Sequence, residues 1–103
     1  MKMTEAQLQQ AVMDLAAIRG WEQLHLRPAQ TAKGWRVPVQ GSMGKGWPDL
    51  TLVRGSRIIF VELKGAKGTL TPDQLWVLDR LRLAAEVYVW KPEDWDTIVE
   101  VLG

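Results

Sequence analysis

The feature that most constrains the fold is a pair of β-rich runs, 49–54 and 57–64, separated only by the dipeptide Gly55-Ser56. Glycine at the first central position of a two-residue loop is typical of a type II′ turn, because that position requires a positive φ. The two runs are therefore expected to form a tight antiparallel hairpin whose register the turn fixes.

This register determines which side chains face each other. Asp49 is expected directly opposite Glu62, with Cβ atoms about 5 Å apart, and Lys64 lies on the same face as Glu62 because side chains alternate along a strand. The opposite face carries a continuous apolar layer of Leu50, Leu52, Ile59, Val61 and Leu63. One face of the hairpin is thus expected in the core, while the other ends in two acids and a lysine.

Two facing acids destabilise a hairpin unless something offsets their charge. Mg²⁺ would do so, because it binds one or two carboxylates, keeps several waters and leaves positions for phosphate oxygens. Lys64 would then place a positive charge beside the metal, where it stabilises developing charge or orients an attacking water. The alternative is an exposed cluster in which Lys64 simply offsets the acids. A register slip of one residue would remove the arrangement.

The remaining elements are expected around this hairpin. Capping signals and helical spacing predict three helices, which start at Thr4, Thr71 and Pro92 and end near Gly20, Arg82 and Leu102. Alternation predicts three further strands, at 22–28, 35–40 and 86–90. Pro38 restricts the second of these to an edge. The resulting order is αβββαβα, with one early strand left open.

Glu5 lies on the same face of the first helix as Val12 and Ala16, so a carboxylate heads the stripe that is expected to be buried. The alternative is an acid in the first turn that the helix dipole favours. The glycine-rich segment 41–48 is not a phosphate-binding Walker A loop, because Gly46 stands where that motif needs Ser or Thr after Lys45.

Composition excludes several chemistries. The chain has no cysteine, which excludes disulfides, zinc fingers and thiol nucleophiles, and its one histidine is His25. With 103 residues, 47% of them hydrophobic, we expect one folded domain over 1–103. No apolar run approaches the roughly 18 residues of a membrane span, and the first ten residues lack the apolar stretch of a signal peptide. A cytoplasmic protein is therefore expected, with no membrane partner.

The net charge is only +1, but charged residues are distributed unevenly between the two halves of the chain. Residues 1–57 contain eight Lys or Arg and four Asp or Glu. Residues 58–103 contain five Lys or Arg and eight Asp or Glu. A basic first half would suit an anion such as nucleic acid, or would be a solvated surface. The candidate phosphate contacts are Lys33, Arg36, Lys45 and Lys67, with ordinary loop solvation as the alternative for each. Trp35 and Trp47 would stack on bases or pack beside the hairpin.

The segments Pro48-Asp49 and Glu62-Leu63-Lys64 together resemble the motif of the PD-(D/E)XK nuclease superfamily. The chain is more closely similar to its VRR-NUC family, the virus-type replication-repair nucleases, in which an N-terminal Glu and a Gln on the following helix accompany the motif. Here these are Glu5 and Gln74. The resemblance implies an α/β, restriction-endonuclease-like αβββαβ core, with a mixed central sheet flanked by helices.

The resemblance also implies metal-dependent hydrolysis of phosphodiester bonds. Asp49, Glu62 and the backbone carbonyl of Leu63 would hold Mg²⁺ or Mn²⁺, with Glu5 as an accessory acid at the metal or its water. Lys64 would be the catalytic lysine. Gln74 would orient groups at the site, although a helix cap alone also explains a glutamine there.

Small stand-alone phage members of this family resemble the chain in length. They act as homodimers on branched DNA such as four-way junctions, in the manner of Holliday junction resolvases, which implies the cytoplasm of a bacterial or phage-infected cell. The alternatives are a flap, single-strand or restriction-like nuclease, or a module with a nuclease fold that binds DNA or a partner protein without cutting.

Overall fold

The computed structural model describes residues 3–26, 29–31, 34–36 and 40–103, without the side chains between 27 and 39. Its α-helices are α1 (Glu5–Ile18), α2 (Pro72–Arg82) and α3 (Trp95–Leu102). Its strands are β1 (Glu22–His25), β2 (Ala29–Thr31), β3 (Gly34–Arg36), β4 (Leu50–Arg54), β5 (Arg57–Leu63) and β6 (Glu86–Trp90). Two short 3₁₀ helices, η1 (Gly44–Gly46) and η2 (Pro92–Asp94), precede β4 and α3. The helix expected to start at Pro92 therefore begins as a 3₁₀ turn and is α-helical only from Trp95.

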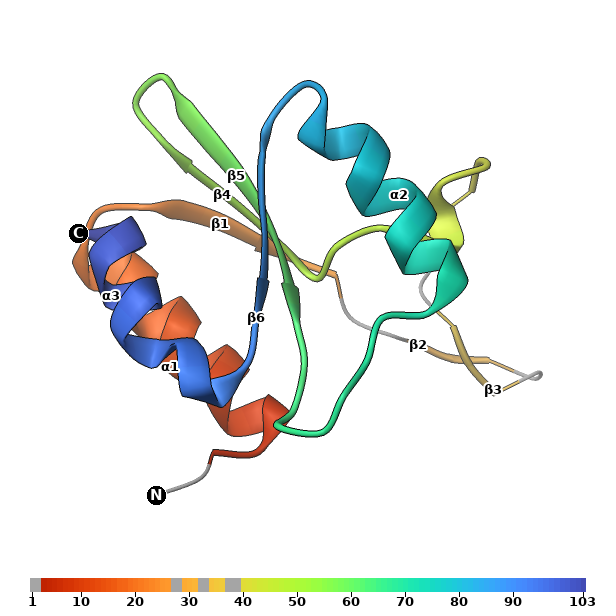
Figure 1. The fold of residues 1–103 in the computed structure, drawn as a ribbon, viewed down its shortest axis with the longest axis horizontal. Coiled ribbons are helices and arrows are strands. Elements are labelled where there is room, and N and C mark those ends of the chain that lie inside the picture. The colour runs from red at the N-terminus through yellow and green to blue at the C-terminus, as the bar shows by residue number, and fades with distance from the viewer. Residues whose placement is uncertain (1–2, 27–28, 32–33, 37–39) are drawn as a thin grey trace.

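The central sheet has the strand order β1-β4-β5-β6 (Figure 1). β1, β4 and β5 are antiparallel neighbours, whereas β6 lies parallel to β5 because α2 carries the chain back across the sheet. In Figure 1, α1 and α3 lie on one side of these strands and α2 on the other. The expected mixed sheet flanked by helices is confirmed.

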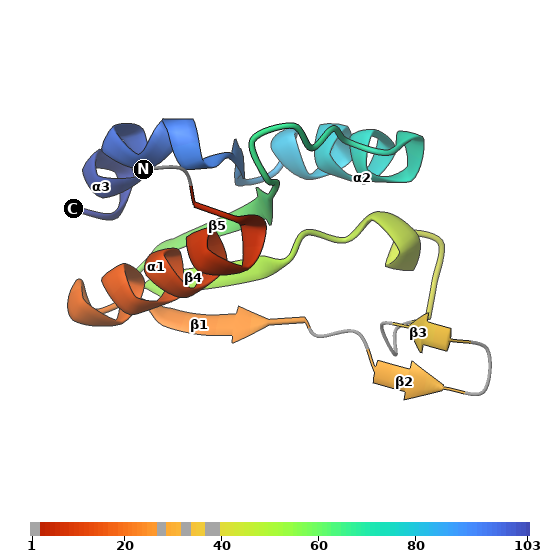
Figure 2. The ribbon, with the colours of Figure 1, turned by 90° about the horizontal axis from the view of Figure 1, so that it is seen from below.

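The early strands differ from expectation. The predicted strand 22–28 ends at His25, and an unpredicted strand, β2, follows it. The predicted strand 35–40 is β3, which begins one residue earlier and ends at Arg36; Gln40 lies outside any strand and 37–39 lie outside the described residues. β2 and β3 pair only with each other (Figure 2). Alternation identified strand character here, but the split into two sheets depends on tertiary pairing.

The β4–β5 hairpin has the predicted register. Leu50 pairs with Val61 and Arg54 with Arg57. Gly55 has φ of 61°, and no non-glycine residue in the described ranges has a positive φ. A type I′ turn would need a positive φ at Ser56 as well, so the turn is type II′, as the Gly-Ser dipeptide predicts. All five apolar residues predicted for the inner face are buried.

The main core lies between this inner face and the two helices α1 and α3. The buried stripe of α1 contains Val12 and Ala16, as expected, and α3 contributes Ile98 and Leu102. Burying each large aliphatic side chain contributes about 1.5–3 kcal/mol. The core therefore anchors β4 and β5 firmly, which holds the outer face of the hairpin in place.

A charged contact accompanies the start of the parallel pairing of β6 with β5. Arg57 donates two hydrogen bonds to Glu86, of 2.7 and 2.8 Å. The Arg57 guanidinium, helped by the Tyr88 hydroxyl, lowers the pKa of the Glu86 carboxyl to about 2. Bidentate pairs of this kind have a defined geometry, so this one supports the backbone register in which Glu86 pairs with Ile59.

Helix α2 packs closely on η1 at Gly46. Thr71 caps the helix, with Pro72 at its first position, as predicted. A Cβ atom at Gly46 would overlap the Asp73 carbonyl and lie 2.8 Å from Val77 Cγ2. Only glycine permits this approach of two backbones, and it places the first turn of α2 over the segment that leads into Asp49.

Replacing Gly46 with alanine is therefore expected to destabilise the fold by about 1–3 kcal/mol, since a Cβ would force α2 away from η1. The matched control is Gly65→Ala, where a Cβ would make ordinary contact at 3.9 Å and φ is not positive. Both substitutions reduce unfolded-chain entropy alike. Urea unfolding of the two variants would show a lower midpoint for Gly46→Ala alone; equal midpoints would contradict the account.

Candidate active site

The two acids of the hairpin meet where β4 begins and β5 ends. Asp49 immediately precedes β4, and its Oδ2 accepts a hydrogen bond of 2.8 Å from the backbone N–H of Leu63. Its own carbonyl accepts one of 3.0 Å from Leu26. These bonds tie Asp49 to both neighbouring segments, so its carboxylate is held beside the end of β5.

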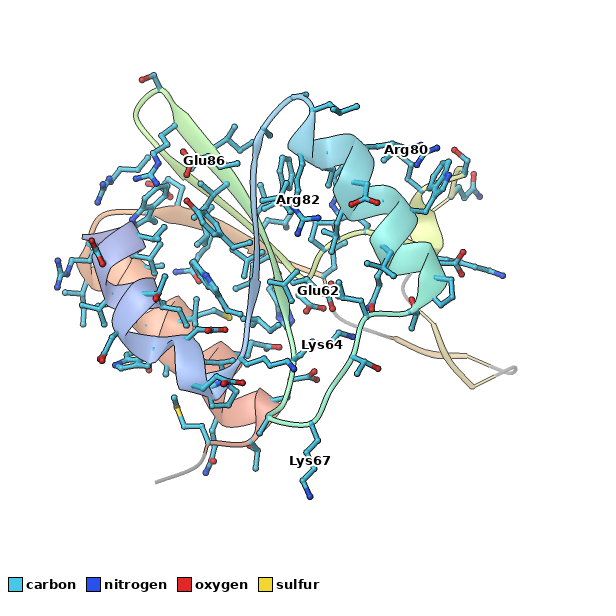
Figure 3. The ribbon with its side chains drawn as sticks, viewed as in Figure 1. Glu62, Lys64, Lys67, Arg80, Arg82 and Glu86 are labelled. Carbon is cyan, nitrogen blue, oxygen red and sulfur yellow. The ribbon has the colours of Figure 1, made fainter. Side chains whose placement is uncertain are left out.

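Glu62 is the one buried charged residue in the described ranges and is only 2% exposed. Its Oε2 accepts a hydrogen bond of 3.1 Å from Gln74 Nε2 and lies 3.5 Å from Lys64 Nζ. Its Oε1 is buried without a hydrogen-bond partner in the described part of the chain. Figure 3 shows Glu62 and Lys64 next to one another at the end of β5.

The environment strongly favours a proton on Glu62. Burial, and then the negative charge of Asp49, raise the pKa of the Glu62 carboxyl to about 8, although Lys64 acts in the opposite direction. An acid that is kept neutral by a second acid nearby is a common property of functional sites. The positive charge of Lys64 is not enough to let Glu62 ionise beside Asp49 at neutral pH.

A divalent cation would supply that charge and would also coordinate the unpartnered oxygen of Glu62. The described residues contain no group of three or more His, Cys, Asp or Glu placed to hold a metal. The protein therefore offers two adjacent carboxylates, Asp49 and Glu62, rather than a complete cage of side chains. This donor set fits Mg²⁺ or Mn²⁺, which bind through few carboxylates and keep coordinated waters.

Gln74 takes part in the helix cap and in the site at the same time. Its Oε1 accepts a hydrogen bond of 2.9 Å from the Thr71 N–H, which completes the capping box. Its Nε2 donates to Glu62. The cap fixes the side chain of Gln74, which in turn fixes the orientation of Glu62. Its role in a reaction stays a prediction.

Glu5 is exposed at the start of α1 and lies near Gly65, which follows Lys64 in the chain. A Cβ built at Gly65 would lie 3.9 Å from the Cβ of Glu5. Glu5 is thus near the end of β5 but belongs to no described group of metal ligands. Its predicted role as an accessory acid stays a prediction, as does that of the Leu63 carbonyl.

The loop after β5 supports Lys64 through a second close backbone approach. A Cβ at Gly68 would lie 3.1 Å from the Cβ of Lys64, and the Gly68 N–H donates to the Gly65 carbonyl at 3.0 Å. Sequence reasoning did not single out Gly68 or the packing role of Gly46. Glycine is the signal for such contacts, but only the fold shows which glycine makes one.

The structure describes only two of the four side chains that are candidate phosphate contacts. Lys45, on η1, and Lys67 are both exposed, and in Figure 3 Lys67 extends away from Glu62 and Lys64. The backbone of Arg36 belongs to β3, whereas Lys33 and the side chains of Arg36 and Trp35 lie outside the described residues. These contacts stay predictions.

Trp47 packs beside the hairpin. Its ring meets that of Phe60 edge-on, with the centroids 5.5 Å apart and the planes at 81°. This geometry is typical of a packing contact between aromatic rings.

No helix in the described ranges combines the length and apolarity needed to cross a bilayer.

Comparison with known proteins gives one informative result. No family model matches the chain, and no curated protein matches it. Among solved structures, the chain is similar to a protein described as "VRR_NUC domain protein", with a TM-score of 0.64 and 23% sequence identity. The match covers 100% of this chain and 93% of that one. The chain therefore has, over its whole length, the fold of a VRR_NUC domain protein, and the fold expected from the resemblance is confirmed.

Proposed function

We propose that residues 1–103 form a single nuclease domain of the VRR-NUC family, which hydrolyses phosphodiester bonds in DNA with Mg²⁺ or Mn²⁺. The observation that carries this proposal is the buried carboxylate of Glu62, which has an unpartnered oxygen, a second acid beside it and Lys64 at 3.5 Å. The fold likeness supports it. A non-cutting module would gain nothing from so unfavourable an acid pair.

In this proposal Asp49, Glu62 and the Leu63 carbonyl would hold the metal, with Glu5 as the accessory acid. When bound, the metal would polarise the phosphate and lower the pKa of a water. Lys64 contributes a positive charge beside the reacting phosphate. The N–H of Leu63 orients Asp49, and Gln74 orients Glu62. Lys33, Arg36, Lys45 and Lys67 would contact phosphates farther along the DNA.

Removing a carboxylate charge or the lysine is expected to abolish most cleavage. Glu62→Gln and Lys64→Ala should each slow plasmid nicking in Mg²⁺ on the order of 10²–10³-fold, because each removes a charge aimed at the reacting group. Glu100→Gln, which changes an exposed acid of α3, is the control and should cut as the wild type does. Wild-type rates in both site variants would refute the proposal.

For the substrate we propose branched DNA, with four-way junctions cut faster than other forms. Matched oligonucleotides that form a junction, a flap, a single strand or a linear duplex would test this in one assay. Faster cutting of flaps or single strands would instead support those alternatives. Tight binding without cleavage, unchanged by EDTA, would support the non-cutting module. A cytoplasmic setting, in a bacterial or phage-infected cell, stays a prediction.

We further propose a homodimer, since a two-fold dimer presents two sites to a two-fold junction. An apolar patch of Leu24, Val53 and Ile58 supports it. These side chains are 57%, 37% and 43% exposed, and the register places them on the same sheet face. Ile58→Lys is expected to shift sedimentation from dimer to monomer, whereas Leu83→Lys, on the already exposed end of α2, is not. A monomeric wild type would exclude the dimer.

Stability without metal is expected to fall as pH rises. Below the ordinary carboxyl pKa of 4.5, Glu62 is protonated in both states. Between pH 5 and 8 the unfolded chain loses this proton first, so the free energy of unfolding falls by about 3 kcal/mol. The lowered pKa of Glu86 changes the free energy of unfolding mainly below this pH range, between the folded value of about 2 and the ordinary value of 4.5.

Urea unfolding in EDTA at pH 5 and pH 8 would measure this loss. Glu62→Gln should remove it, Glu100→Gln should retain it, and Mg²⁺ should raise the stability of the wild type at pH 8. Wild-type protein whose stability does not fall between pH 5 and 8 in EDTA would contradict the assignment of the buried acid.

A further inference from the structure

The parallel pairing of β5 and β6 places a second lysine beside Lys64. Leu63 pairs with Trp90, and the Lys64 N–H donates to the Trp90 carbonyl at 3.0 Å. Paired residues of neighbouring strands point to the same face, and Leu63 and Trp90 both point into the core. Lys91 follows with extended backbone, φ −118° and ψ 165°. Lys64 and Lys91 are therefore neighbours on the opposite face, where Glu62 also lies.

The two lysines line one pocket of about 380 Å³ between the ends of β5 and β6 and the start of α2. The chain from Gly68 to Leu70 forms one wall, and Leu75 and Val89 give the pocket an apolar side. This volume falls within the range of pockets that bind small ligands or their parts. Lys64 borders both the pocket and Glu62, so the pocket adjoins the candidate active site.

The pocket is positively charged, because two lysines and no acid stand among the described residues that line it. Lys64 Nζ lies 3.5 Å from Glu62 Oε2, but no ion pair in the described part of the chain includes Lys91. Asp94, which lies close in sequence, accepts the Lys91 backbone N–H at 2.8 Å. Unlike exposed Lys67, Lys91 is half-buried. Desolvated positive charge beside an apolar wall suits a phosphate with its attached sugar.

We propose that this pocket binds a backbone phosphate of the DNA adjacent to the phosphate that is cleaved, with Lys91 as its binding residue. The proposal rests on the proposed function and extends it, because it assigns a contact that positions the strand beside Lys64. Lys91 holds the DNA and takes no part in bond cleavage.

The test measures binding without cleavage. A fluorescein-labelled DNA duplex is titrated in EDTA over a series of NaCl concentrations with wild type, Lys91→Gln, Lys91→Arg and Arg19→Gln. Arg19 is exposed at the opposite end of α1 from Glu5, so its variant has the same loss of charge far from the site. Thermal melting establishes that each variant is folded.

Lys91→Gln is expected to weaken binding several-fold and to reduce the slope of log Kd against log salt by about 0.9, the value for one phosphate contact. Lys91→Arg should retain the wild-type slope, and so should Arg19→Gln. A wild-type slope in Lys91→Gln, or an equal loss in Arg19→Gln, would overturn the proposal.

The outcome separates this site from the nuclease activity. A wild type that binds duplex with the expected Lys91 dependence but cuts no form of DNA would refute hydrolysis and support the phosphate site. A wild type that cuts DNA while Lys91→Gln binds and cuts normally would support hydrolysis and refute the phosphate site. A wild type that does not bind duplex in EDTA would also refute it.

Discussion

The structure depends on the burial of the apolar layer of the β4–β5 hairpin, which forces two acids, Asp49 and Glu62, together on the other face. Isolated, this arrangement is unfavourable, since it raises the pKa of Glu62 to about 8 and leaves one carboxylate oxygen without a partner. It persists because the apolar layer on the opposite face of the same hairpin is buried. Slipping the register would relieve the acids only by exposing that apolar layer.

Helix α2 and the loop before it support this site from the side of the sheet that faces away from α1 and α3. Gly46 lets the first turn of α2 approach η1, and the cap of that helix directs Gln74 to Glu62. Gly68 likewise lets the loop after β5 pack closely against Lys64. The cap of α2, the close packing at Gly46 and the buried Glu62 are thus connected to one another. The geometry that positions the site is therefore the same geometry that packs the second layer of the fold.

Much of this arrangement could be predicted from sequence because it depends on local rules. The Gly55-Ser56 turn determines the pairing back to the start of β4 at Leu50, and alternation then assigns each side chain to a face. Capping residues identify where α1 and α2 begin. The separate β2–β3 pair was not predictable in this way, since short strands choose partners by what the rest of the fold leaves available.

The sequence by itself therefore determined the hairpin, the starts of α1 and α2 and the meeting of Asp49, Glu62 and Lys64. Only the tertiary structure decided that Glu62 is buried, that Gln74 contacts it while capping α2, and that Lys91 stands beside Lys64. The physical reason is the range of the interactions. Turn and strand periodicity act between near neighbours in the chain, whereas a parallel crossover joins segments that no local pattern relates.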